Sequence, residues 1–157
     1  MATYTDSYGF QKGSAAPLAR GLNKTSRIEV TLDFPKIIAA RLAAGVTALA
    51  AGDVLEVLPV PAKSIISNVG MDVTTAAGVT STIAIGDGTA ATGYLAATSA
   101  NATGVSGGVP VLSSGAFAPT LSGGKLYTAA DTIDITIGTA VPAAAVVRVF
   151  ATLTDVS

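Results

Sequence analysis

Apolar and polar residues alternate along several parts of the chain, which is typical of β-strands that bury one face. In the first such part, Ile28, Val30 and Leu32 share one face of the expected strand. Glu29 and Thr31 occupy the other face. The pattern therefore predicts a half-buried strand from residue 27 to residue 33.

The same alternation returns later in the chain. Ile83 and Ile85 face the expected core in one segment. Ile133, Ile135 and Ile137 share one face of another. Together with shorter apolar runs, the pattern predicts further strands at residues 54–57, 65–73, 80–85, 132–137 and 146–153.

Two regions weaken this pattern. Pro59 and Pro61 separate the first two of these further strands and mark a strand end or a sheet edge. Residues 89–124 are rich in Gly, Ala, Ser and Thr. They predict only weak strands, near Tyr94, at residues 109–112 and at residues 116–121.

One helix is predicted after the first strand, at about residues 34–44. Asp33 can cap its N-terminus, and Pro35 lies in the first turn, where its missing N–H breaks no helical hydrogen bond. Gly45 is a natural stop. The apolar residues with helical spacing are Phe34, Ile37, Ile38 and Leu42.

About eight to ten short strands with frequent turns are typical of a β-sandwich or a barrel. We therefore predict a mainly β chain in which residues 27–157 form a single antiparallel β-sandwich or jelly-roll-like barrel. Residues 1–26 should precede it as an extended arm, because residues 9–23 contain three glycines and a proline and show no periodicity.

The composition of the arm differs from that of the rest. Residues 1–27 carry four basic residues and one acid, whereas residues 28–157 carry five basic residues and nine acids. A disordered tail is the alternative interpretation, but such tails are usually poor in aromatic residues, which favours an arm ordered by a partner. The candidate partner-binding residues are Tyr4, Tyr8, Phe10, Lys12, Arg20, Lys24 and Arg27.

Composition excludes much catalytic chemistry. Ala, Thr, Gly and Ser make up 79 of the 157 residues, and the sequence contains no His, Cys or Trp. Without His or Cys, neither a Ser-His-Asp or Cys-His nucleophile system nor an ordinary zinc or haem site can form. We predict that the chain is not an enzyme and has no cofactor, no metal site and no small-molecule substrate.

Charge and hydropathy limit the partners. The net charge of −1 gives no general attraction to nucleic acid. The most apolar stretch, residues 42–51, is too short for a bilayer helix, and the N-terminus lacks the basic start and apolar run of a signal peptide, so we expect no membrane association. A mean hydropathy of +0.60 with 12% charged residues favours a protein that buries much of its surface against other proteins.

Two features that suggest binding have simpler explanations. The sequence Gly86-Asp87-Gly88-Thr89 lacks the spacing of a dinucleotide-binding loop and the extra carboxylates of a calcium loop, so we expect a turn. Tyr94 and Tyr127 could stack on a sugar, but isolated tyrosines more often pack in a core or at a sheet edge.

Paired acids are the remaining candidates for chemistry. Asp131 and Asp134 are three residues apart on an expected strand and should face opposite sides of the sheet. The same spacing separates Asp53 from Glu56. We therefore expect all four to be turn and surface acids.

One resemblance extends over residues 27–157. It is carried by residues 51–62 (AGDVLEVLPVPA), 86–89 (GDGT), 127–135 (YTAADTIDI) and a Val-rich closing strand at 147–156. In this order and spacing, these segments resemble those of small head proteins of tailed bacteriophages.

The resemblance implies a capsid decoration, or cement, protein with a β-sandwich or jelly-roll-like fold and extended arms. Such a protein binds the outer surface of the capsid and stabilises contacts between subunits of the major capsid protein. The resemblance also implies self-association as a homotrimer and location on the capsid exterior after synthesis in the host cytoplasm. The arm residues would then contact a neighbouring subunit or the shell.

Two other functions remain open. One is a different virion part, such as a head fibre base or a tail subunit. The other is a sugar-binding β-sandwich module, although the loop-rich residues 89–124 hold only two aromatic residues, Tyr94 and Phe117, and no acid. A carboxylate-only glycosidase would need two acids about 5–10 Å apart in a cleft.

Overall fold

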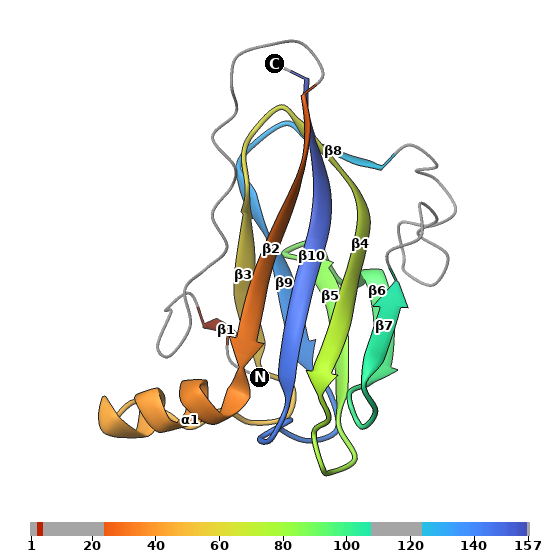
Figure 1. Ribbon diagram of the computed structural model, residues 1–157. Helices are drawn as coiled ribbons and strands as arrows, with labels where there is room; N and C mark the ends of the chain where they lie inside the picture. The colour runs from red at the N-terminus through yellow and green to blue at the C-terminus, as the bar shows by residue number, and fades with distance from the viewer. Residues whose placement is uncertain (1–2, 5–23, 108–123, 157) are drawn as a thin grey trace.

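Ten strands and one helix form the parts of the chain that the computed structural model describes, residues 3–4, 24–107 and 124–156. The strands make two sheets that pack face to face, and the helix extends from one end of the sandwich (Figure 1). The prediction of a mainly β chain with an antiparallel β-sandwich and one short helix is confirmed.

The first sheet, sheet A, has the strand order β1-β3-β9-β5-β6. Its strands are β1 (Thr3–Tyr4), β3 (Val54–Val60), β5 (Thr82–Asp87), β6 (Ala90–Ser99) and β9 (Asp131–Ile137). All neighbours are antiparallel except β1, which runs parallel to β3. β9 lies in the middle, where Ile135 is opposite Leu55 on one side and Ile85 on the other.

The second sheet, sheet B, has the order β2-β10-β4-β7, and β8 also pairs with β4. Its strands are β2 (Thr25–Asp33), β4 (Ser64–Thr75), β7 (Gly104–Gly107), β8 (Lys125–Tyr127) and β10 (Val146–Asp155). β10 pairs with β2 from Val146 opposite Asp33 to Thr154 opposite Thr25 without a register shift. Its other edge pairs with β4, so β10 is the central strand of this sheet.

The core lies between the two sheets and follows the predicted alternation. Ile28, Val30 and Leu32 of β2 are buried, whereas Glu29 and Thr31 between them are exposed. In the other strands, too, the apolar side chains that face the opposite sheet are buried. The largest fully buried side chains are Phe34, Leu32, Ile37, Leu55, Leu58, Ile66, Met71, Ile83, Ile85, Ile133, Ile135 and Ile137.

The helix, α1 (Phe34–Ala43), forms where the sequence predicts it. The Asp33 carboxylate accepts a hydrogen bond from the Lys36 amide at 3.2 Å, and Gly45, at φ +65°, follows the helix end. Leu42, expected on the apolar face, is instead 80% exposed, because the last turn of α1 extends beyond the sheets (Figure 1). Among the described residues, no helix is long and apolar enough to cross a membrane.

Pro59 marks a sheet edge, which is one of the two positions predicted for it. It lies inside β3, which continues to Val60. On the side away from β9, the described residues pair with β3 only at Val54 and Leu55, so Pro59 lies on an edge, where a residue without an N–H is tolerated. The weak strand near Tyr94 is β6, and the weak strands expected at 109–112 and 116–121 lie outside the described residues.

The β5–β6 hairpin gives a first testable prediction. A Cβ added at Gly86 would overlap the carbonyl oxygen of Ala90 and lie 2.5 Å from the carbonyl carbon of Ala91, both backbone atoms. We expect Gly86→Ala to lower the free energy of unfolding by about 1–3 kcal/mol, as overpacking does, measured by urea denaturation. In the matched control Gly88→Ala, the added atom comes no nearer than 3.8 Å to Asp131, so the change should stay within about 0.5 kcal/mol. Equal effects of the two substitutions would contradict this close packing.

Candidate functional site

A hollow of about 260 Å³ opens on the outer face of sheet A. It is bordered by the starts of β3 and β6, the β5–β6 turn and the outward residues of β9. Four of its lining residues are acids, and none is basic. The lining residues are Val54, Glu56, Asp87, Gly88, Thr89, Ala90, Ala91, Asp131, Thr132, Asp134 and Thr136.

Asp134 is the most perturbed acid of the hollow. It is 6% exposed and lies opposite Glu56 in the β3–β9 register. Burial raises its pKa, a hydrogen bond from the Thr132 hydroxyl at 2.7 Å opposes the rise, and the negative charges of Glu56, Asp131 and Asp87 add to it. The pKa of Asp134 is thereby raised to about 6.

The expectation that the paired acids are turn and surface residues is wrong for two of them. Asp53 and Asp134 are buried. The Asp53 carboxylate accepts a hydrogen bond from the Ala50 amide at 2.9 Å and so fixes the loop that leads into β3. Asp131 and Asp134 do not lie on separate surfaces either, since both line the hollow. Asp131 is the first residue of β9, where strand alternation does not yet fix the direction of a side chain.

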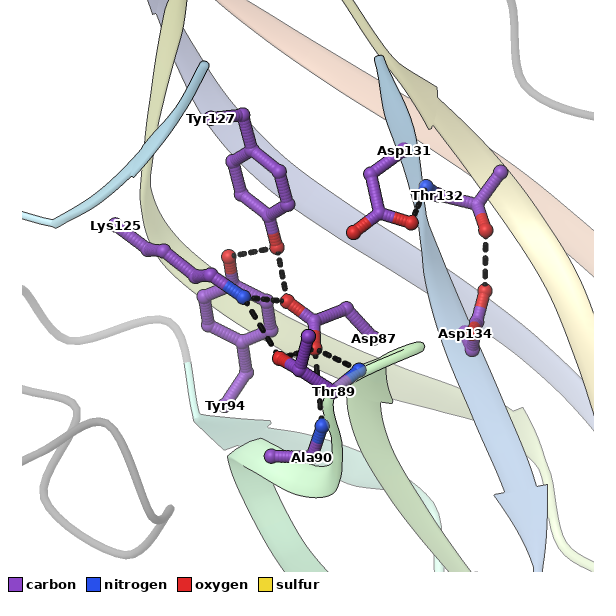
Figure 2. Close-up of polar contacts among 9 residues, drawn as sticks. All are labelled: Asp87, Thr89, Ala90, Tyr94, Lys125, Tyr127, Asp131, Thr132 and Asp134. Atoms are coloured by element: carbon purple, nitrogen blue, oxygen red, sulfur yellow. Dashed lines mark hydrogen bonds and ion pairs between the residues drawn. The ribbon is translucent and has the colours of Figure 1, made fainter. Parts of the chain in front are cut away.

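Asp87 is the centre of a polar cluster beside the hollow (Figure 2). Its side chain is fully buried. One carboxylate oxygen accepts from the Thr89 amide and hydroxyl at 2.9 and 2.6 Å and from the Ala90 amide at 3.1 Å. The other oxygen is in contact with the Lys125 ammonium and accepts from the Tyr127 hydroxyl at 2.5 Å.

The cluster joins the two sheets. Asp87 ends β5 of sheet A, whereas Lys125 and Tyr127 belong to β8 of sheet B. The Tyr127 hydroxyl also lies 2.6 Å from the hydroxyl of Tyr94 on β6. Burial alone would raise the pKa of Asp87, but hydrogen bonds from Lys125, Thr89 and Tyr127 outweigh it and lower the pKa to about 2. Asp87 is therefore held as a carboxylate that the ammonium of Lys125 balances.

The sequence-based interpretations of the turn and the tyrosines are confirmed. Residues 88–89 form the turn between β5 and β6, closed by the pairing of Asp87 with Ala90. Tyr94 and Tyr127 are only 2% and 4% exposed, and burial raises the pKa of both hydroxyls. Neither ring presents a free face on which a sugar could stack.

Sequence reasoning missed Lys125 as a partner of Asp87, although the sequence contains a signal. Residues 73–130 hold a single acid, Asp87, and a single base, Lys125. Two lone opposite charges in so long an uncharged stretch favour a pair, because an isolated buried charge is costly.

Three of the candidate arm residues lie within the described parts of the chain. Tyr4 belongs to β1, whose backbone pairs with β3 at Val54 and Leu55, beside the hollow. Lys24 precedes β2, and its carbonyl accepts from the Asp155 amide at 3.0 Å. Tyr8, Phe10, Lys12 and Arg20 lie outside the described residues.

Arg27 lies on β2 of sheet B. Its side chain pairs with Glu29 at 3.2 Å, and its guanidinium lies 4.4 Å from the ring centre of Phe150. Tyr4 lies on the other sheet, at the opposite end of the sandwich from the start of β2 (Figure 1). The structure therefore does not bring Tyr4 together with Lys24 and Arg27.

The lining of the hollow is acidic. It holds four acids, and one of them, Asp87, is bound to Lys125. Within residues 3–4, 24–107 and 124–156, no group of three or more acids, cysteines or histidines is placed to hold a metal ion.

Comparisons with known proteins place the fold among phage capsid structures. A chain in the structure "Capsid of Ralstonia phage GP4" matches with a TM-score of 0.53 and 17% identity, over 92% of this chain and 91% of that chain. A chain in "Cyanophage Pam1 capsid asymmetric unit" matches with a TM-score of 0.52 and 19% identity, over 90% and 92%. No protein-family model and no curated protein sequence matches. The resemblance to phage head proteins is thus confirmed at the level of the fold.

Asp87 gives a prediction about acid stability. Because its folded pKa of about 2 lies below the unfolded value, its ionised form stabilises the fold above about pH 4, and this contribution is lost as the pH falls towards 2. Asp87→Asn should cost about 2–3 kcal/mol at pH 7 and flatten the acid limb of the stability curve, measured by urea denaturation from pH 2 to 7. The control Asp72→Asn, at the more exposed Arg148 pair, should cost less than about 1 kcal/mol. An unchanged acid limb in Asp87→Asn would refute the assignment.

Asp134 gives a prediction of opposite sign. Its folded pKa of about 6 exceeds the unfolded value, so its protonated form stabilises the fold below about pH 4 and this contribution is lost as the pH rises through 6. Asp134→Asn, which keeps an oxygen for Thr132, should therefore raise the free energy of unfolding at pH 8 by about 1–3 kcal/mol and have little effect at pH 4. Asp131→Asn is the control and should change stability at pH 8 by less than about 1 kcal/mol. Destabilisation by Asp134→Asn at pH 8 would contradict the prediction.

Proposed function

We propose that this chain is a structural protein of a phage virion that binds the outer surface of the capsid and stabilises contacts between major capsid subunits. The observation that carries the proposal is the shared fold with chains of two phage capsid structures over about nine-tenths of each chain. The sequence resemblance to phage head proteins in residues 51–62, 86–89 and 127–135 supports the same class.

The described surface favours a binding role over catalysis. The two tyrosines that could face a sugar are buried, and the buried carboxylate of Asp87 is balanced by Lys125. The low charge and the abundance of small residues suit close contact between protein surfaces. We therefore propose that the chain is not an enzyme and acts at the capsid exterior as a self-associating protein, with a homotrimer as the expected form.

The arm supplies the proposed contact with the shell or a neighbouring subunit. Tyr and Arg side chains often dominate the free energy of binding at interfaces, and residues 1–27 are the basic part of an otherwise acidic chain. A segment with these residues is suited to attach the sandwich to an acidic or aromatic-lined surface of the major capsid protein.

Binding to empty capsids tests the proposal. Purified protein is mixed with capsids that lack it, from the phage whose genome encodes the chain, and bound protein is measured by co-sedimentation. We expect saturable binding of the natural chain. Full-length protein with Tyr8→Ala, Phe10→Ala, Lys12→Gln and Arg20→Gln should bind at least about tenfold more weakly, because such side chains are typical of interface hot spots.

A charge-matched control distinguishes the effect of the arm residues on binding from the effect of a change in net charge. Lys36→Gln with Lys63→Gln removes two positive charges from exposed positions of the sandwich and should leave binding unchanged. Absence of binding by the natural chain would refute the decoration role. Natural-level binding by the arm variant would refute the role of the arm residues.

A further inference from the structure

We propose that two copies of this chain join their copies of sheet B by antiparallel pairing of the β2 edges that face away from β10. The inference builds on the self-association in the proposed function. A contact between identical edges has two-fold symmetry and joins only two copies, so it is additional to a homotrimer. The partner surface is therefore the same surface, residues 25–31, of a second copy.

β2 forms a long and regular edge of sheet B. Among the strands that the structure describes, it pairs with β10 alone. It has nine residues, contains neither proline nor glycine, and pairs with β10 without a register shift. The backbone N–H and C=O groups that point away from β10 are therefore arranged to pair with another strand along most of its length.

The other described edges carry features that oppose such pairing. β3 contains Pro59 and shifts register against β9. β6 shifts register twice against β5. β1, β7 and β8 have only two, four and three residues. Proline, bulges and short strands are the usual means by which proteins protect a sheet edge, and β2 has none of them.

Charge on the outer face of β2 selects the register of the pairing. Arg27 and Glu29 are the charged residues in the middle of the strand, and their side chains are 53% and 47% exposed. In an antiparallel pair centred on Ile28, Arg27 of each copy is opposite Glu29 of the other. Thr25 is then opposite Thr31. Opposite charges in facing positions stabilise an antiparallel pair.

Neighbouring registers are less favourable. A shift by two residues places Arg27 opposite Arg27 or Glu29 opposite Glu29, and like charges in facing positions are destabilising. A shift by one residue would set the exposed face of one strand beside the buried face of the other. Within a copy, Arg27 already pairs with Glu29 at 3.2 Å. Pairing of two copies would join these charges into a network of four, which stabilises more than an isolated exposed pair does.

Disulfide trapping tests the contact, since the natural chain contains no cysteine. Thr25 and Thr31 are both exposed and are about 20 Å apart along β2, too far for a disulfide within one chain. A tagged full-length chain with Thr25→Cys is mixed with an untagged full-length chain with Thr31→Cys. We expect mild oxidation to give a mixed disulfide at least about tenfold more abundant than in the control below, because pairing raises the effective concentration of the two thiols.

The control mixes Thr25→Cys with Val105→Cys, an exposed residue on β7 of sheet B. Oxidation is carried out on free protein and on capsid-bound protein. If the mixed disulfide between positions 25 and 31 is no more abundant than the control in both samples, the proposal is overturned. That outcome includes the case in which another part of the chain or the capsid covers the β2 edge.

An exchange of charges tests the complementarity of the two edges. Arg27→Glu in both copies, or Glu29→Arg in both, leaves like charges facing each other and should lower the yield of the mixed disulfide at least about fivefold. Arg27→Glu in one copy and Glu29→Arg in the other should restore the yield. The pair within each chain is lost in all three mixtures, so the recovery can come only from contact between copies. A yield that stays low in the last mixture would refute the proposed pairing.

Capsid co-sedimentation of the same proteins separates the two proposals. Capsid binding without the mixed disulfide refutes the β2 contact and leaves the decoration function intact. Mixed disulfides without capsid binding support the β2 contact and refute the decoration function.

Discussion

The two sheets depend on strands that come from the end of the chain. β9 lies between β3 and β5 in sheet A, and β10 lies between β2 and β4 in sheet B. Each of these pairs joins residues far apart in the sequence, such as Phe150 with Glu29 and with Gly70. Neither sheet can therefore close before the last quarter of the chain is in place, which makes the sandwich one cooperative unit that is dominated by long-range contacts.

This central position explains the composition of β9. A strand paired on both edges and covered by the other sheet must bury its inward side chains, and Ile133, Ile135 and Ile137 are fully buried. The outer face of β9 is also partly covered, because residues of β3 and of the β5–β6 turn line the hollow together with it. The Asp134 carboxyl is therefore removed from water, unlike an outward acid on an edge strand. This desolvation disfavours its charged form and raises its pKa.

The Asp87–Lys125 pair has a different role from the apolar core. β8 pairs with only three residues of β4 and buries one large side chain, Tyr127. Its attachment to sheet A depends on Lys125 and Tyr127 reaching Asp87. A buried ion pair adds little net stability over an apolar contact, but removal of one partner is costly, so the pair fixes where β8 lies.

The sequence predicted the elements that follow simple periodicity. The β2 strand, the helix with its Asp33 cap and the isoleucine face of β9 were all visible because each depends on residues close in the sequence. The hollow could not be predicted from the sequence, because it arises from the register of β3 with β9 and of β5 with β9. Glu56 and Asp134 are the last pair before a register shift between Glu56 and Leu58, and no local pattern predicts either the pair or the shift.

The same distinction bears on the arm. The sandwich closes its sheets with residues 25–155, and β1 adds two pairs to one edge. Residues 1–24, which precede β2, hold three of the eight aromatic residues and three of the nine basic residues. Exposed clusters of aromatic side chains mark interaction sites, and ordering long basic side chains costs conformational entropy. The proposed contact of this segment with another protein surface would account for their concentration ahead of β2.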